Sequence, residues 1–204
     1  PKTNIHQSAK QLLNDSRFDE AKEILTELLE EDPSDFLAMH MLGLLAKKAK
    51  QWNLAIAFFT KAIETNRVDF ASYFERGLVY RKIANLPSSI SDFSFALKIN
   101  PVSVEALNNR GIALCQAGNP AQAIVDFSEA IALKPNCSQT YFNRGLAHRT
   151  FGQISAALDD YTRSIELDSK NYRAFNNRAM LHRDSKNFDE AIQDLDKCHS
   201  VRPD

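Results

Sequence analysis

Long apolar runs are absent from this 204-residue chain, and so is any excess of charge of one sign. The longest apolar stretches, LGLLA at 42–46 and LAIAFF at 54–59, are far shorter than the roughly 20 residues that a membrane-spanning helix needs. Lysine and arginine number 25 and aspartate and glutamate 26, so the formal net charge is −1. A neutral chain without an aromatic stacking platform does not favour nucleic acid. We therefore expect neither a membrane nor a nucleic acid as partner.

Cysteine and glycine are scarce, and their placement excludes several kinds of chemistry. Cys115, Cys137 and Cys198 are odd in number and far apart, which suits a reducing, cytoplasmic location better than a disulfide framework. No glycine-rich phosphate loop occurs, and no serine or cysteine has a histidine and an acid in a recognisable arrangement. His148 and His182 have no third ligand with metal spacing, which favours packed, hydrogen-bonded histidines. We therefore predict no catalysis, no cofactor and no metal site.

The chain does contain an internal repeat. Arg76, Arg110, Arg144 and Arg178 are each separated by 34 residues, and the same step extends through the whole chain without an insertion. When this arginine is numbered position 7 of its unit, four of the six glycines fall at position 8 and four of the seven prolines at position 32. The six repeats so defined are 2–35, 36–69, 70–103, 104–137, 138–171 and 172–204.

Each repeat has the pattern of two antiparallel helices. Positions 8, 20 and 27 are small in nearly every copy, and position 24 is large, so two helix backbones can approach closely beside one bulky side chain. Proline at position 32 cannot continue a helix and is expected to end the second one, in the sixth repeat at Pro203. Ser34, Ser103 and Ser138 lie where the next helix is expected to be capped. The sequence therefore predicts twelve helices in six hairpins and no β-strand.

This pattern resembles the tetratricopeptide repeat family in its period, its small residues at positions 8, 20 and 27, its large position 24 and its proline at position 32. The resemblance covers residues 2–204. It implies an all-α fold, a single right-handed superhelical solenoid of six antiparallel helix-turn-helix repeats with a concave surface. It is specific for the fold and says little about function.

The repeated arginine needs a partner, because burying a lone charge is costly. Position 23 is aspartate in the four repeats that carry the arginine and apolar in the two that do not, as in Leu42 with Phe58. We predict an ion pair within each repeat, since pairing to the next repeat would leave Arg76 and Asp194 without partners. The planar fork of arginine can hold a carboxylate through two hydrogen bonds. We therefore assign these arginines to structure rather than to a ligand.

The resemblance implies a ligand surface on the first helices, chiefly at positions 2, 5, 6, 9, 12 and 13. Asparagine fills position 6 in three successive repeats and resembles the asparagine series in the repeat arm of O-linked N-acetylglucosamine transferases. An amide can pair with the backbone of an extended peptide without demanding a sequence. The basic side chains at position 12 favour acidic or C-terminal carboxylate segments. The residues so assigned to peptide binding are Asn109, Asn143, Asn177, Asn108, Asn176, Lys47, Arg81, Arg149, Arg183, Phe74 and Phe142.

Two functions fit these features. The first is a non-catalytic scaffold that binds an extended peptide or partner segment of a protein in its concave groove. The second is the substrate-recruiting arm of a larger enzyme such as a glycosyltransferase. The sixth repeat also offers apolar side chains at an edge that nothing in the repeat itself covers, which indicates self-association through this uncapped C-terminal repeat or further chain beyond it. These edge residues are Phe175, Met180, Ile192 and Leu195.

Overall fold

The computed structural model describes residues 2–201, and every regular element in that range is an α-helix. The prediction of twelve helices without a β-strand is thereby confirmed for the described residues, whereas Pro203 lies outside them. None of these helices is both long enough and apolar enough to cross a bilayer. The helices are α1 (Lys2–Asn14), α2 (Phe18–Glu31), α3 (Phe36–Lys48), α4 (Trp52–Thr65), α5 (Phe70–Lys82), α6 (Leu86–Ile99), α7 (Val104–Gln116), α8 (Pro120–Leu133), α9 (Ser138–Thr150), α10 (Ile154–Leu167), α11 (Tyr172–Asp184) and α12 (Phe188–Val201).

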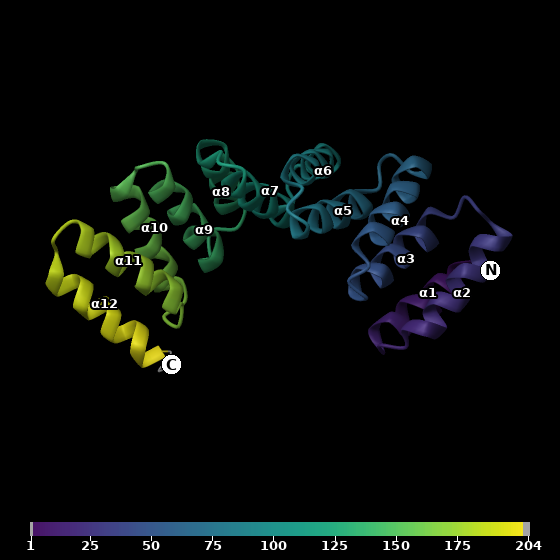
Figure 1. The fold of residues 1–204 in the computed structure, drawn as a ribbon, viewed down its shortest axis with the longest axis horizontal. Coiled ribbons are helices and arrows are strands. Elements are labelled where there is room, and N and C mark those ends of the chain that lie inside the picture. The colour runs from purple at the N-terminus through teal and green to yellow at the C-terminus, as the bar shows by residue number, and fades with distance from the viewer. Residues whose placement is uncertain (1, 202–204) are drawn as a thin grey trace. The chain divides into compact units, whose positions relative to one another are not determined.

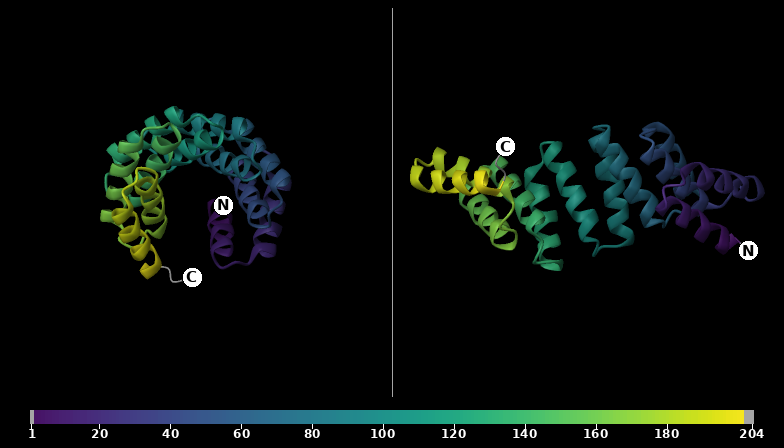
Figure 2. Two further views of the ribbon diagram at one scale, coloured as in Figure 1. Left: turned by 60° about the vertical axis from the view of Figure 1, so that its left-hand side comes forward. Right: turned by 90° about the horizontal axis from the view of Figure 1, so that it is seen from below.

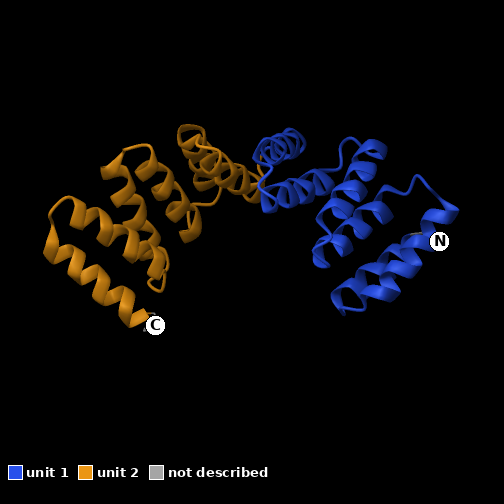
Figure 3. Cartoon of the chain, in the orientation of Figure 1, with its two compact units in different colours: residues 1–101 blue, residues 102–204 orange. Residues whose placement is uncertain are grey.

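Odd-numbered helices are the first helices of the repeats and even-numbered helices are the second. Each first helix packs against the second helix of its own repeat to form a hairpin (Figure 1). The chain divides into two compact units of three hairpins each, residues 1–101 (unit 1) and 102–204 (unit 2) (Figure 3). Within each unit, consecutive hairpins lie side by side, as the two further views in Figure 2 also show.

The core of a repeat is built around positions 8 and 24. A Cβ atom on Gly111 would lie 2.7 Å from Cε1 of the fully buried Phe127, so only glycine lets this ring pack against the first helix. The repeats that carry alanine at position 8 have leucine at position 24, as in Ala9 with Leu25. The small residue and the large residue are thus matched in size in repeats one to five, where position 24 is fully buried, as the sequence pattern predicts.

The helix caps differ in part from the prediction. Ser103 caps α7 by accepting a hydrogen bond from the amide of Ala106, at 3.2 Å, which confirms its expected role. Ser34 and Ser138 do not cap helices: Asp35 is the N-cap of α3, and Ser138 is the first residue of α9. The N-cap of the next first helix is therefore position 34 of repeats one to five, one residue away from both of these serines.

The predicted arginine–aspartate pairs are present within all four repeats. In each one, Nε and Nη2 of the position 7 arginine donate to the two carboxylate oxygens of the position 23 aspartate, at 2.6–2.9 Å. The four aspartates are buried, and the arginines are partly buried. The pairs are Arg76–Asp92, Arg110–Asp126, Arg144–Asp160 and Arg178–Asp194.

A third hydrogen bond, which the prediction did not include, joins the arginine to the preceding repeat. Nη1 of Arg144 donates to Oγ of Ser128 at 3.0 Å, and Nη1 of Arg178 donates to Oγ1 of Thr162 at 2.9 Å. Both hydroxyls occupy position 25 of a second helix. The Thr162 hydroxyl also donates to the carbonyl of Leu158, so its oxygen is free to accept from the arginine. The arginine therefore connects three helices in adjacent repeats.

Candidate functional site

The candidate binding surface lies on the first helices, where position 12 of one repeat meets position 6 of the next. Two such contacts occur within the units, one in each. In unit 1, Nζ of Lys47 on α3 donates to the carboxylate of Glu75 on α5. In unit 2, Nη1 of Arg149 on α9 donates to Oδ1 of Asn177 on α11 at 2.8 Å. The same register therefore holds an ion pair in unit 1 and a cation beside a neutral amide in unit 2.

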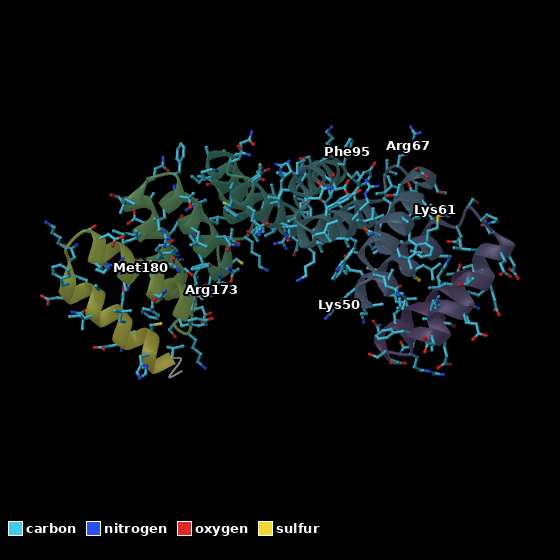
Figure 4. The ribbon with its side chains drawn as sticks, in the orientation of Figure 1. Lys50, Lys61, Arg67, Phe95, Arg173 and Met180 are labelled. Carbon is cyan, nitrogen blue, oxygen red and sulfur yellow. The ribbon has the colours of Figure 1, made fainter. Side chains whose placement is uncertain are left out.

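The positive charge of Arg149 is not neutralised by any carboxylate that the structure describes. Its aromatic neighbour is Tyr161, and burial raises the pKa of the Tyr161 hydroxyl to about 12, an effect that the charge of Arg149 partly offsets. Arg173, which is labelled in Figure 4, lies on α11. Its guanidinium carbon is 4.8 Å from the ring centroid of Phe142. Arg173 also forms no ion pair within residues 2–201. We call Arg149, Arg173 and Asn177 the arginine–asparagine cluster.

Helix periodicity explains how this cluster is assembled. Arg173 and Asn177 are one turn apart on α11, and Nδ2 of Asn177 donates to the backbone carbonyl of Arg173 at 2.8 Å. That bond leaves Oδ1 of Asn177 directed to Arg149. Phe142 and Arg149 are seven residues apart on α9 and so lie on one face of that helix, two turns apart. The two guanidinium groups therefore lie along the seam between α9 and α11.

The three position 6 asparagines already have local partners for part of their amide groups. Nδ2 of Asn109 donates to the carbonyl of Glu105 at 2.8 Å, one turn earlier in α7. Oδ1 of Asn143 accepts from Nε2 of Gln139 at 2.9 Å. An incoming peptide would therefore have to use the remaining hydrogen-bonding positions of these amides or displace their local bonds.

Position 5 residues are distributed unevenly between the surface and the core. Phe142 is only 1% exposed and packs against Tyr161, with ring centroids 5.9 Å apart, so its side chain is not available to a ligand on the surface. Phe74 is partly exposed and stacks on Phe70 at 5.7 Å. Asn176 is exposed, whereas Oδ1 of Asn108 is buried and accepts no hydrogen bond from the described residues. The expectation that Phe142 contacts a peptide directly does not fit its buried position.

The remaining basic residues at position 12 differ in their surroundings. Arg183 is exposed and forms an ion pair with the adjacent Asp184, with Nη2 2.9 Å from Oδ1. Arg81 is partly buried, and this burial lowers the pKa of its guanidinium. Arg149 is partly buried as well, and its hydrogen-bond partner, Asn177, is neutral.

No group of three or more metal-ligating side chains is present among the described residues. Nδ1 of His148 lies 2.6 Å from Oε1 of Gln153, and its Nε2 lies 3.7 Å from the Asp160 carboxylate. Nδ1 of His182 is buried and has no hydrogen-bond partner within residues 2–201. His148 is thus the packed, hydrogen-bonded histidine that the sequence indicates, whereas His182 is packed without a bond at that nitrogen.

Comparison with protein families gives matches over most of the chain. A family model described as "Tetratricopeptide repeat" matches residues 104–137, and a second model with the same description matches residues 7–69 and 142–197. A search of the curated proteins gave no match. The family models thus cover repeats in both units.

Solved structures with the same fold are numerous but distant in sequence. YrrB, a TPR protein with an unusual peptide-binding site, is 23% identical with a TM-score of 0.76, over 88% of this chain and 93% of its own. A MamA protein is 19% identical with a TM-score of 0.77, over 82% and 92%. The pilF protein of Pseudomonas aeruginosa is 18% identical with a TM-score of 0.81, over 98% and 91%. At these identities the similarity establishes the fold.

Proposed function

This chain belongs to the tetratricopeptide repeat family, and from that premise we propose that it is an interaction scaffold whose first-helix face binds an extended acidic peptide. Proteins of this fold act as scaffolds for other proteins, and the peptide-binding site of YrrB supports a peptide as the ligand class. The ligand site that we assign is the arginine–asparagine cluster of unit 2. The acidic character of the ligand follows from the charges there.

The observation that carries this proposal is the contrast between two equivalent contacts. Lys47 meets Glu75 in unit 1, so the charges of that pair cancel. Arg149 meets Asn177 in unit 2, and the neutral amide orients the guanidinium without neutralising it. A cation held in place without a counter-charge is pre-organised for a carboxylate, because little side-chain entropy remains to be lost on binding.

The geometry of the cluster suits an extended segment rather than a single small anion. Arg149 and Phe142 are two helical turns apart on α9, and Arg173 of α11 lies over Phe142. The two guanidinium groups are therefore placed one after the other along α9. Carboxylate side chains two or more residues apart in an extended peptide could meet both. The amides of Asn143 and Asn177 would pair with the peptide backbone between them. The same face would serve equally in the substrate-recruiting arm of a larger enzyme.

A binding experiment with defined peptides tests the proposal. The probe is a fluorescein-labelled peptide of about ten residues that alternates glutamate and serine, and its counterpart has glutamine in place of glutamate. We expect the acidic peptide to bind at low salt and to weaken as salt screens the charges. Arg149→Gln removes a charge-assisted contact and should weaken binding by about tenfold or more. Fluorescence anisotropy measures both effects.

Controls separate this site from general charge attraction. Arg163→Gln removes the same charge from an exposed residue on the second helix α10, where it pairs with Glu166. This variant should bind the acidic peptide as the parent protein does. Equal weakening by Arg149→Gln and Arg163→Gln would mean that only the overall charge matters. Equal binding of the glutamine peptide would contradict the assignment of an acidic ligand.

A further inference from the structure

A second surface lies on the first repeat, away from the arginine–asparagine cluster. It is a cavity of about 290 Å³ between α1 and α2, which we call the acidic notch. Its floor is apolar and is formed by Ile5, Ile24 and Leu28, and its charged lining consists of Glu27 and Glu31. Neither glutamate forms an ion pair with the residues that the structure describes. The notch therefore combines an apolar floor with two uncompensated negative charges.

The corresponding face of later repeats shows what kind of element such a surface receives. Ser8 and Ile24 occupy positions 7 and 23, which are arginine and aspartate in repeats three to six. In repeat three, Nη1 of Arg76 donates at 2.8 Å to Oγ1 of Thr60 on α4, the second helix of the repeat before it. This face of a repeat is thus covered by a helix elsewhere in the chain. In repeat one, the described residues place no helix on it.

The charges around the notch are particular to the first repeat. Positions 26 and 30, occupied here by Glu27 and Glu31, are both acidic in no other repeat. The helix that carries them, α2, has six acidic side chains and one lysine. Glu27 and Glu31 are one helical turn apart, so their carboxylates lie in a row beside the apolar floor. An occupant must therefore offer apolar side chains flanked by positive charges.

We propose that the acidic notch binds a basic amphipathic helix of a partner protein. Leucine or isoleucine side chains of that helix would contact Ile5, Ile24 and Leu28, and lysine or arginine side chains would pair with Glu27 and Glu31. A helix fits because its side chains also repeat every turn, in step with the two glutamates, and because a helix covers the same face in later repeats.

A second copy of this chain is a poorer occupant. Its second helix α12 exposes Phe188 and Ile192 but carries Asp196 at position 25, the position that in other repeats contacts the following repeat. In a head-to-tail contact this aspartate would approach the notch and its two glutamates, and like charges at an interface are unfavourable. The charge pattern therefore favours a partner of opposite sign.

The test uses an 18-residue synthetic peptide of leucine and lysine with its leucines on one helical face, a length of about five turns. Isothermal titration calorimetry should show binding that weakens at least about tenfold in E27Q/E31Q. The matched control E23Q/E30Q removes the same charge from exposed residues of the same helix that do not line the notch, and it should bind within about twofold of the parent protein. Circular dichroism of each variant verifies that the helices remain folded.

Four outcomes would overturn the proposal. If both double variants weakened peptide binding equally, the peptide would be responding to the total negative charge of α2 and not to the notch. If a peptide with serine in place of leucine bound equally well, the apolar floor would not contribute to binding. Absence of binding would mean that the notch takes no basic helix. A doubled mass in light scattering that E27Q/E31Q returns to a monomer would make a second copy the occupant. Arg149→Gln should leave this peptide unaffected, so failure here is distinct from failure of the acidic-peptide proposal.

Discussion

Arg76 donates to both carboxylate oxygens of Asp92, and Nε–Oδ2 and Nη2–Oδ1 are each 2.8 Å. Its third donor reaches Thr60 in the preceding repeat. The aspartate is 3% exposed, so the pair is largely withdrawn from water. In repeat two the same two positions hold Leu42 and Phe58. The same two repeat positions are therefore filled by an ion pair in repeat three and by two apolar side chains in repeat two.

Arg76→Ala should destabilise the protein by about 3 kcal/mol or more, because it leaves Asp92 buried with a charge that nothing compensates. The double variant R76L/D92F copies repeat two and should recover most of that loss, since apolar replacement of a buried pair is often neutral. Urea unfolding monitored by circular dichroism measures both. A double variant as unstable as Arg76→Ala would show that the pair has a role that apolar packing cannot replace.

The sequence predicted this pair because position 7 and position 23 vary together among the repeats. The 34-residue period also predicted where the helices begin and end. The bond to position 25 was readable in the same alignment of repeats, since Thr26, Thr60, Ser94, Ser128 and Thr162 all carry hydroxyls. It was not predicted because a buried arginine calls first for a carboxylate to compensate its charge, and these five side chains are neutral hydroxyls.

The binding face was harder to predict, for a physical reason. A repeat position fixes which side of a helix a residue occupies, but the exact exposure depends on the neighbouring side chains. Phe74 and Phe142 share position 5, yet Phe74 is partly exposed, whereas Phe142 is buried. Similarly, position 12 predicted four basic residues, but the contact of position 12 with position 6 of the next repeat was not predicted. It separates Lys47, which meets Glu75, from Arg149, which meets Asn177.

Gly111→Ala should destabilise unit 2 by about 1–3 kcal/mol, because its Cβ would lie 2.7 Å from the ring of Phe127. Phe127→Leu alone should also be destabilising, since it leaves space in the core. The double variant G111A/F127L should lose less than the sum of the two, because the buried pair Ala9 and Leu25 already uses this combination. Thermal unfolding of all four proteins measures the coupling. Strict additivity would contradict the size matching of positions 8 and 24.

The exposed apolar side chains of α12 predict self-association. Ile192 is 57% exposed and Leu195 is 48% exposed, and with Phe188 they follow one side of the helix, whereas Phe175 is buried. An apolar stripe of this kind marks an interface. We expect the mass from light scattering to rise with protein concentration and I192S/L195S to suppress the rise. The control L54S changes an exposed leucine on the second helix α4 of unit 1. A parent protein that remains monomeric at high concentration would refute this prediction.

Unit 1 should lose stability as the pH falls, through His40. Burial lowers the pKa of His40 below its ordinary value of 6.5, and its Nδ1 lies 2.9 Å from Oγ of Ser72. The unfolded chain therefore takes up a proton on His40 at a higher pH than the folded chain does. The stability that neutral His40 provides is fully present above pH 6.5 and is lost as the pH falls from 6.5 toward the lowered pKa.

His40→Phe isolates this effect, because position 5 is phenylalanine in repeats three and five and the ring can still pack against Phe59. The substitution removes the hydrogen-bond partner of Ser72 at every pH, so it also changes the unfolding midpoint at any single pH. The quantity to compare is therefore the change in the unfolding midpoint between about pH 7.5 and about pH 5.5. That change should be smaller in His40→Phe than in the parent protein. The same substitution at His199, which lies exposed on α12 of unit 2, is the control for exchanging a histidine for phenylalanine outside unit 1. An identical pH dependence in His40→Phe and the parent would show that other groups govern the acid sensitivity of unit 1.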